Sequence, residues 1–261
     1  MTELTFANWL GTVPEWLAGW PEGVQRLFFQ FYQTFVYQDR WTFFTNGLKT
    51  TFLITLGALL LGVLIGVLVA VVRSAHDSRR AGARPNLVLN FFNTVCKLYL
   101  TVIRGTPMMV QLLIMGYVIL KPRGEQAVLV TAIVAFGINS GAYVAEIVRS
   151  GIMSISAGQM EAGRSLGLTY GKTMWYIIIP QAIKNILPAL GNEMITLIKE
   201  TSIVTVIAGK DLTKAAQVIV TKTNQYLVPY ISLAVIYLVI VLILTKLLGL
   251  LERRLRTSDR R

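Results

Sequence analysis

The sequence predicts an all-α, polytopic membrane protein with five transmembrane helices. Of its 261 residues, 54% are hydrophobic and only 15% are charged. The stretch Thr50–Val72 contains no charged residue, and a helix needs about 20 apolar residues to cross the hydrocarbon core of a bilayer. The apolar runs are continuous, whereas the strands of a membrane β-barrel alternate apolar and polar residues. Helices are therefore expected, since a membrane-spanning backbone must satisfy its own hydrogen bonds.

The expected transmembrane helices follow in order at residues 50–72, 100–120, 127–148, 186–208 and 227–250. The second is broken by Arg104-Gly105-Thr106-Pro107, because proline lacks a backbone N–H and disfavours helix at the residue before it. We expect an interfacial helix before this break and a membrane segment after it. The fourth is interrupted by Lys199-Glu200-Thr201-Ser202, and irregular backbone at membrane depth persists only beside protein or a watery cavity.

Three regions are expected along the chain. Residues 1–45 form an extracytoplasmic or interfacial segment, residues 46–250 a transmembrane domain with a polar loop at 150–184, and residues 251–261 a basic tail. The first region is rich in tryptophan, phenylalanine and tyrosine, which favour the membrane–water boundary. Val24–Tyr37 is expected to form a helix that lies on the membrane.

The distribution of lysine and arginine predicts the orientation. Loops 73–85, 149–184 and 246–261 would share one side of the membrane, and this side holds more lysine and arginine than the other. The positive-inside rule then places the C-terminus in the cytoplasm and the N-terminus outside. The net charge of +12 suits anionic lipid headgroups. Nucleic acid is not an expected partner, because the basic residues are spread over loops.

The loop at 150–184 carries helix signals. Ser156 followed by Gln159 matches a capping box, so a short helix is expected to begin at Ala157. Glu161 would lie in its first turns, where a negative charge suits the helix dipole. Gly167 can adopt the left-handed conformation that ends a helix.

One face of this helix would be bare. Ala162 and Gly163 have almost no side chain, so another protein could approach closely there. A second, amphipathic helix is expected at Thr169–Pro180, with Met174, Trp175, Ile177 and Ile178 facing apolar surroundings. An ordinary cytoplasmic loop is the alternative interpretation of this stretch.

Nucleotide binding by this chain is not expected. Gly167-Leu168-Thr169-Tyr170-Gly171-Lys172-Thr173 resembles a phosphate-binding loop but is one residue short between its glycines. No apolar strand precedes it. No catalytic residue, metal site or cofactor is expected either, and the chain is not expected to be an enzyme. His76, among basic loop residues, is expected to be a solvated surface residue.

The spacing of Glu161-Ala162-Gly163, Gly167 and Ile177-Ile178-Ile179-Pro180 resembles the EAA loop of ABC importer permeases, which docks on an ATPase subunit. Further segments resemble the same family in the same order: Asn46–Phe52, Tyr99 with Ile103–Pro107, Gly141–Arg149, Gly158–Ala162, and Asn192-Glu193 with Leu197 and Lys199–Ser202. The chain is thus similar to the histidine/glutamine/arginine-type permeases. Gly163 and Ile179 depart from the usual alanine and leucine.

The resemblance implies a type I importer fold in the bacterial cytoplasmic membrane. It implies as partners two ATP-binding cassette subunits that hold ATP and magnesium, a second permease of the same or a homologous chain, and an extracytoplasmic solute-binding protein. The substrate would be an amino acid. The residues implied to contact the ATPase are Gln159, Glu161, Ala162, Gly163, Leu166 and Gly167.

Polar residues within the spans are candidates for the substrate path, because such residues are costly in lipid and tend to face cavities. Asn139, Tyr143 and Glu146 share one helical face. Glu146 could pair with an ammonium or a cationic side chain, while the other two orient the amino acid. The alternative is interhelical hydrogen bonding, with Glu146 paired to Arg149. Arg104, Lys199 and Glu200 are further candidates for a gate or lining.

Two stripes of small residues indicate close helix packing rather than a ligand site. Their members are Ala58, Gly62, Gly66 and Ala70 in the first span and Gly137, Gly141 and Ala145 in the third. Alternating access driven by ATP is the expected mechanism. An ion-coupled secondary amino-acid transporter is the alternative, but such transporters usually show paired halves, and no internal repeat is evident. A membrane scaffold without transport would need no docking loop.

Overall fold

The computed structural model describes residues 4–77 and 86–257, and every regular element in these two ranges is a helix. The α-helices are α1 (Phe6–Leu10), α2 (Glu15–Ala18), α3 (Glu22–Phe31), α4 (Trp41–Asp77), α5 (Leu87–Gly105), α6 (Met108–Leu113), α7 (Glu125–Met153), α8 (Ala157–Ser165), α9 (Tyr170–Thr173), α10 (Ile179–Glu200), α11 (Leu212–Thr223) and α12 (Leu227–Thr257). Tyr32–Val36, Ile114–Ile119 and Met174–Ile178 are π-helical, and Tyr37–Asp39 and Thr201–Ile207 are 3₁₀-helical. The predicted all-α class is confirmed.

Four helices in the described ranges are long and apolar enough to cross a membrane. They are Trp41–Asp77, Leu87–Gly105, Glu125–Met153 and Leu227–Leu255. The expected first, third and fifth spans lie within α4, α7 and α12. The polytopic membrane class is therefore supported, and the second and fourth spans are where the structure differs from the sequence-based expectation.

The second expected span, 100–120, is divided at Pro107, where the sequence predicts a break. Helix α5 ends at Gly105 and α6 begins at Met108. The helix before the break is the one long enough to span, whereas Met108–Ile119 is only a shorter apolar helix. Asn86 fixes the start of α5, because its Oδ1 accepts a hydrogen bond from the backbone N–H of Leu89 at 3.1 Å. A helix before the break was expected, but as an interfacial one, whereas α5 is long and apolar enough to cross a membrane.

The fourth expected span, 186–208, is also composite. Helix α10 extends from Ile179 to Glu200 and continues as the 3₁₀ segment Thr201–Ile207. Its N-terminal half carries Lys184 and Asn185, so it is not among the four most apolar helices. The interruption that the sequence predicted at Thr201 is thus a tightening of the helix, and the chain leaves it at Ala208 in a left-handed conformation.

Close packing of α4 against α7 forms the centre of the molecule. A methyl group added to Gly66 would lie 2.6 Å from Val144 Cγ1 and 2.8 Å from the Ala145 backbone nitrogen. A methyl group added to Gly62 would lie 2.9 Å from Ser140 Oγ. The predicted role of the small-residue stripes is confirmed, since only hydrogen fits at these positions. The adjoining core contains Ile54, Ala58, Leu112, Ala132, Ala135, Phe136, Leu197, Val204 and Ile207.

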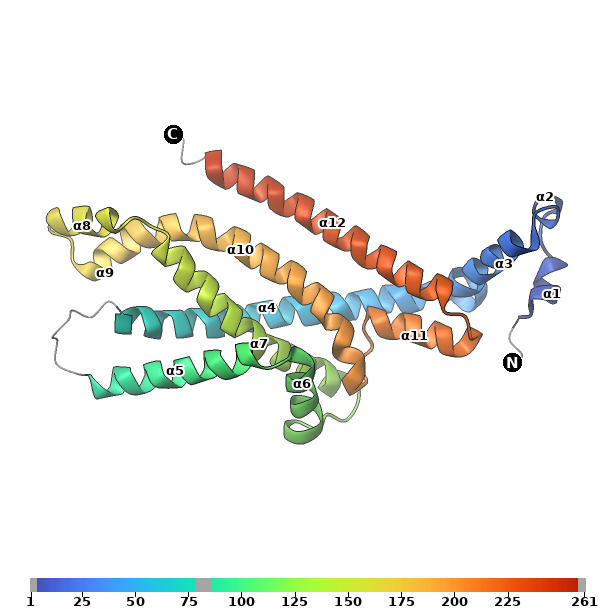
Figure 1. Ribbon diagram of the computed structural model, residues 1–261, viewed down its shortest axis with the longest axis horizontal. Helices are drawn as coiled ribbons and strands as arrows, with labels where there is room; N and C mark the ends of the chain where they lie inside the picture. Colours follow the sequence, from blue (N-terminus) through green and yellow to red (C-terminus); the bar gives the residue numbers. More distant parts are fainter. Residues whose placement is uncertain (1–3, 78–85, 258–261) are drawn as a thin grey trace.

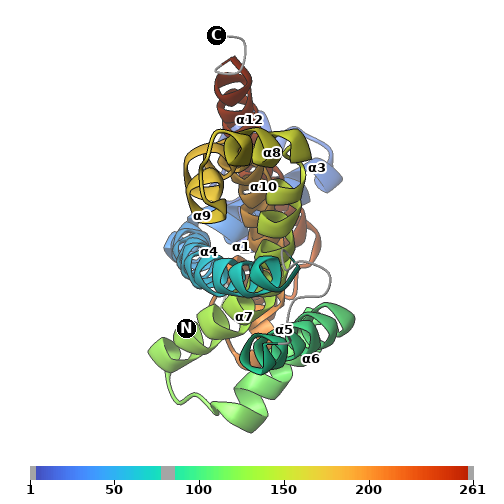
Figure 2. The same cartoon turned by 90° about the vertical axis from the view of Figure 1, so that its left-hand side faces the viewer.

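The helices run lengthwise between two ends (Figure 1). Helices α8 and α9 lie at one end, which is also where α12 finishes, and α1–α3 and α11 lie at the other. In the view from the α8 end, α8 and α9 stand in front and α3 recedes behind them (Figure 2). The α7–α8 connection thus lies at the α8 end, whereas α6 stands across the long axis near its middle (Figure 1). Helix α12 lies along α10 and leaves most of its surface exposed.

The N-terminal segment forms a small aromatic unit of its own. Trp9, Leu17 and Phe29 are buried together, and the Trp9 and Phe29 ring centroids are 5.3 Å apart. The helix expected at Val24–Tyr37 begins earlier, at Glu22, and becomes π-helical after Phe31. Gln38 and Asp39 then adopt left-handed backbone conformations, which separate this unit from α4.

The α4–α7 contact gives a stability prediction. Replacement Gly66→Ala is expected to reduce the free energy of unfolding by about 1–3 kcal/mol, because the added methyl overpacks a helix contact. Denaturant unfolding of the detergent-solubilised protein measures this change. Gly249→Ala is the matched control, since no atom lies within 4 Å of a methyl group there and helix propensity favours alanine. Equal losses in both variants would contradict the assignment.

Candidate coupling and substrate-path sites

Helix α8 is fixed at both ends by local hydrogen bonds. The Ser156 hydroxyl accepts from the backbone N–H of Gly158 at 3.3 Å, so the helix begins at Ala157 as predicted. At the other end Gly167 has φ +84°, and the N–H of Leu168 reaches the carbonyl of Gly163 at 3.1 Å. These bonds form a Schellman motif. The predicted termination at Gly167 is confirmed.

Gly163 faces inward, which corrects the expectation of a bare face at Ala162 and Gly163. Gly163 is buried, and a methyl group placed on it would lie 2.5 Å from Thr173 Cγ2 and 3.1 Å from Ile177 Cδ1. The glycine thus allows α8 to pack on the next helical segment of its own chain. Ala162 alone of the pair is exposed.

The exposed surface of α8 is formed by the other residues predicted to contact an ATPase subunit. Gln159, Glu161 and Ala162 are exposed, and the Leu166 side chain is 82% exposed. Little of this apolar side chain is therefore covered by its own chain. Trp175 and Tyr176 in the next segment are similarly exposed, at 67% and 69%. Neither was among the residues predicted to contact a partner, although the exposed pair of adjacent aromatic residues is visible in the sequence.

The second helix of the loop continues into the membrane domain. Thr169 caps α9, and the chain passes through the π-helical turn Met174–Ile178 directly into α10. Pro180 does not end the helix as expected, because it occupies the first turn of α10, where a missing N–H costs nothing. Ile178 is buried as expected, whereas the Trp175 side chain is mostly exposed.

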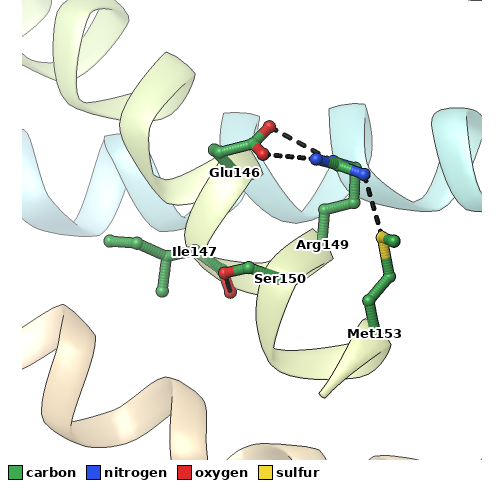
Figure 3. Close-up of polar contacts among 5 residues, drawn as sticks. All are labelled: Glu146, Ile147, Arg149, Ser150 and Met153. Carbon is green, nitrogen blue, oxygen red and sulfur yellow. Dashed lines mark hydrogen bonds and ion pairs between the residues drawn. The ribbon is translucent and has the colours of Figure 1, made fainter. Parts of the chain in front are cut away.

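At the end of α7 nearest α8, Glu146 is held by Arg149 (Figure 3). Arg149 Nη2 donates to Glu146 Oε1 at 2.5 Å, and Nε donates to Oε2 at 3.2 Å. Arg149 Nη1 also approaches the sulfur of Met153 at 2.9 Å. Both carboxylate oxygens are therefore bound within one helix. This geometry is the alternative that the sequence left open for Glu146, and it reduces the capacity of Glu146 to bind an ammonium group.

Three substrate-path candidates nevertheless line one hollow. A pocket of about 620 Å³ is lined by Arg104, Tyr143 and Glu146, together with Arg73 and Lys97. The Arg104 guanidinium lies 5.5 Å from the centre of the Tyr143 ring, within the range of a cation–π contact. Arg73 and Lys97 were not predicted to line it: Arg73 comes from α4, whereas Lys97 lies on α5 seven residues before Arg104, a spacing that places both on one helical face.

Asn139 has a different position from the one expected. It is buried, and its amide donates to Gln111 Oε1 at 3.0 Å. Gln111 Nε2 donates in turn to the backbone carbonyls of Ile103 and Thr106, at 2.7 and 3.1 Å. Asn139 therefore supports the residue that satisfies the open carbonyls at the helix break, and it does not line the pocket of Arg104 and Tyr143.

The remaining candidates lie elsewhere. Lys199 is exposed and Glu200 is half-buried at the end of α10, and neither lines the pocket. A polar bridge between α7 and α10 was not assigned from the sequence: Ser140 Oγ donates to Glu193 Oε1 at 2.8 Å. Within the described residues no group of histidine, cysteine and acidic side chains could hold a metal ion.

The chain matches a known membrane family. Residues 83–257 match the family described as binding-protein-dependent transport system inner membrane component. The arginine transport system permease protein of Bacillus subtilis is 38% identical over 218 residues, covering 83% of this chain and 94% of that protein. The L-cystine transport system permease protein of the same organism is 34% identical, covering 84% and 89%. The glutamine transport system permease protein of Escherichia coli is 39% identical, covering 63% and 76%.

Solved structures agree with the sequence matches. A crystal structure of an amino acid ABC transporter with histidines has a TM-score of 0.72 and 43% identity, covering 82% of this chain and 94% of that one. An inward-facing methionine ABC transporter has a TM-score of 0.66 at 17% identity, which supports the fold alone.

The chain belongs to the family of binding-protein-dependent inner membrane transport components. It is the permease component of an amino acid ABC transporter, which is a transport subunit and not an enzyme. The family resemblance expected from the sequence is confirmed.

The Gln111 network gives a prediction about the helix break. Gln111→Leu is expected to reduce the free energy of unfolding by about 1–3 kcal/mol, because it leaves the buried Asn139 amide and the carbonyls of α5 without their partner. Gln126→Leu, at an exposed position in the first turn of α7, is the control and should change stability by less than about 0.5 kcal/mol. Comparable denaturation midpoints for both variants would refute the role of Gln111.

Proposed function

We propose that this permease passes an amino acid, delivered by an extracytoplasmic binding protein, across the bacterial cytoplasmic membrane. ATP hydrolysis in two separate ATP-binding cassette subunits drives the transport, and ATP with magnesium is bound only there. A second permease, identical or homologous, completes the path. The observation that carries this proposal is the exposed, doubly capped helix α8 at one end of a bundle of apolar helices.

The orientation proposed for the chain places α8 in the cytoplasm. The end that holds α8 also receives the end of α12, while the N-terminal unit lies at the opposite end. Lysine and arginine are more numerous in the loops predicted on the side of α8 than in those predicted on the other side, in agreement with the positive-inside rule. The five-span topology is retained in this proposal, with α10 and its 3₁₀ extension as the fourth crossing and α5 with α6 as the second.

The coupling surface is proposed to consist of Gln159, Glu161, Ala162 and Leu166, with Gly163 and Gly167 shaping the helix rather than contacting the partner. Leu166 provides an apolar anchor, since buried apolar side chains at the centre of an interface contribute most of its energy. The π-helical turn joins this surface to α10 without a break. Movement of the ATPase subunits would reach the membrane helices by this route.

The substrate path is proposed to pass the pocket of Arg104, Tyr143 and Glu146. Its cationic side chains suit the carboxylate that every amino acid carries. Asn139 contributes indirectly, because it holds the helix break that positions Arg104. Lys199 and Glu200 are retained as gate candidates at the junction of α10 with its 3₁₀ extension. The ion-coupled transporter of the alternative interpretation has no observation in its favour, since the chain belongs to the ABC permeases.

Charge reversal on α8 tests the coupling surface. Glu161→Lys is expected to weaken association with the ATPase subunits and to lower ATP-dependent uptake about tenfold, equivalent to about 1.4 kcal/mol at an interface. Uptake is measured in vesicles that contain the reconstituted transporter. Glu22→Lys makes the same charge change on α3 at the opposite end and should leave both quantities unchanged. Normal assembly and uptake in Glu161→Lys would refute the coupling role, and gradient-driven uptake without ATP would refute the proposed function.

Leu166→Ser separates assembly from folding. Its side chain is 82% exposed, so the substitution should change the free energy of unfolding by less than about 0.5 kcal/mol. The affinity for the ATPase subunits should nevertheless fall, because an interface anchor is lost. Copurification of the ATPase subunits with the tagged permease measures the effect, and undiminished copurification would remove Leu166 from the interface.

A further inference from the structure

The pocket of Arg104 and Glu146 collects more positive than negative charge. Arg73 and Lys97 also line this hollow of about 620 Å³, whose volume lies within the range of about 300–1,000 Å³ that is typical of small-molecule sites. Arg149, which binds both carboxylate oxygens of Glu146, is not among the lining residues. Because Arg149 balances the charge of Glu146, three positive charges of the pocket remain uncompensated, those of Arg73, Lys97 and Arg104.

None of these three cations forms an ion pair with a carboxylate of residues 4–77 and 86–257. Arg73 Nε is buried and has no hydrogen-bond partner within the same ranges. The Arg104 guanidinium lies over the Tyr143 ring, so no described carboxylate stands opposite its planar fork of N–H donors. All three side chains are therefore available to an anionic ligand.

The three charges lie in helices that are long and apolar enough to cross a membrane. Arg73 follows the uncharged stretch Thr50–Val72 of α4, and Lys97 and Arg104 lie within α5. Charged side chains in such helices are costly in lipid and almost always face a partner or a watery cavity. Arg104 is in the last turn of α5, where the carbonyl end of a helix favours a cation. Lys97 is in the middle of α5 and lacks this compensation, so its position argues most strongly for a ligand.

The pocket also keeps one site for an ammonium group. A carboxylate has about four lone-pair positions, and Arg149 occupies two of those on Glu146. Arg73 and Arg104 both act electrostatically on Glu146, which places cations from α4 and α5 around the carboxylate of α7. Lys97 extends the positive charge by about 10 Å along the same face of α5. The pocket therefore suits a ligand with one ammonium and more than one carboxylate.

We infer that this pocket selects acidic amino acids, which carry two carboxylates and one ammonium, over neutral and cationic ones. The inference rests on the proposed function, which brings an amino acid through the pocket. The guanidinium groups of Arg73 and Arg104 suit carboxylates, because they donate two parallel hydrogen bonds to one carboxylate, and Lys97 adds a further point charge.

Repulsion adds to this selectivity. A cationic amino acid would bring its side-chain charge among three like charges that no described carboxylate neutralises. A neutral amino acid would leave part of the positive charge without a partner. Specificity in binding sites commonly depends on such unfavourable pairings as well as on favourable ones.

The test measures uptake of tritium-labelled L-glutamate by the assembled transporter. The complex is reconstituted in phosphatidylcholine vesicles with ATP inside, and the soluble binding protein from the same cells that stimulates its ATP hydrolysis is added outside. Uptake of L-glutamate is expected to depend on ATP, to be competed by L-aspartate and to be unaffected by excess L-arginine or L-glutamine.

Replacement of Lys97 then assigns the selectivity to the pocket. Lys97→Gln is expected to lower the maximal rate of L-glutamate uptake about tenfold, because a charged contact with the passing carboxylate is lost. The concentration for half-maximal uptake, which the binding protein sets, should stay within about twofold of wild type. Lys97→Arg keeps the positive charge and should restore most of the maximal rate.

The control is Lys222→Gln, which removes one positive charge from an exposed position on α11 outside the pocket. It should leave the maximal rate within about twofold of wild type. ATP-dependent uptake of L-arginine or L-glutamine without competition by L-glutamate would overturn the inference, while the proposed function would stand. Equal maximal rates for Lys97→Gln and wild type, or for Lys97→Arg and Lys97→Gln, would overturn it as well.

Two further outcomes separate the alternatives. A Lys97→Gln defect that appears only when phosphatidylglycerol is added to the vesicles would assign the cations to lipid headgroups and overturn the inference. Absence of ATP-dependent uptake for every amino acid, or uptake driven by an ion gradient without ATP, would instead reject the proposed function.

Discussion

The contact between α4 and α7 is the constraint on which the rest of the molecule depends. In lipid, apolar surface gains little from leaving its surroundings, so helices associate through close van der Waals packing and interhelical hydrogen bonds. Gly62 and Gly66 bring the two backbones together at a distance that no side chain would permit. Once α7 is buried there, Asn139 and Ser140 on the same helix must find partners inside the protein. Gln111 and Glu193 provide them and thereby locate α6 and α10.

Much of this arrangement follows from local rules that a sequence carries by itself. The small-residue stripes, the cap at Ser156 and the helix end at Gly167 each depend on residues a few positions apart, so their geometry could be predicted. The inward orientation of Gly163 could not. It depends on Thr173 and Ile177, whose position beside α8 is set by the fold of the loop that joins them. The same reason explains why Arg73, on α4, was not assigned to the pocket of Arg104, whereas Lys97 lies seven residues before Arg104 on α5 and could have been predicted.

Hydropathy predicted the membrane class correctly. It predicted the bounds of the second and fourth spans less accurately. At Pro107 the break and a helix before it were both expected, but the pattern favoured an interfacial helix, whereas α5 is long and apolar enough to span. At Thr201 the polar run suggested an interruption, whereas the backbone only tightens into a 3₁₀ segment. In both places polar side chains find hydrogen-bond partners or buried neighbours in the folded protein. Mean hydropathy over a window of residues does not include these contacts. Thr201, for example, is buried and donates its hydroxyl to the carbonyl of Ile198 at 2.7 Å.

The packing of Gly163 on the segment that leads into α10 has a mechanical consequence. Helix α10 has 22 residues, which correspond to about 33 Å of helix length. A rotation of about 5° applied at one end of such a rod displaces the other end by about 3 Å. Pro188 lies within the rod and removes one backbone hydrogen bond, so it provides a point of flexure. A force on α8 would therefore be transmitted along α10 to Thr201 beside the core. The bend available at Pro188 would set how much of that movement arrives.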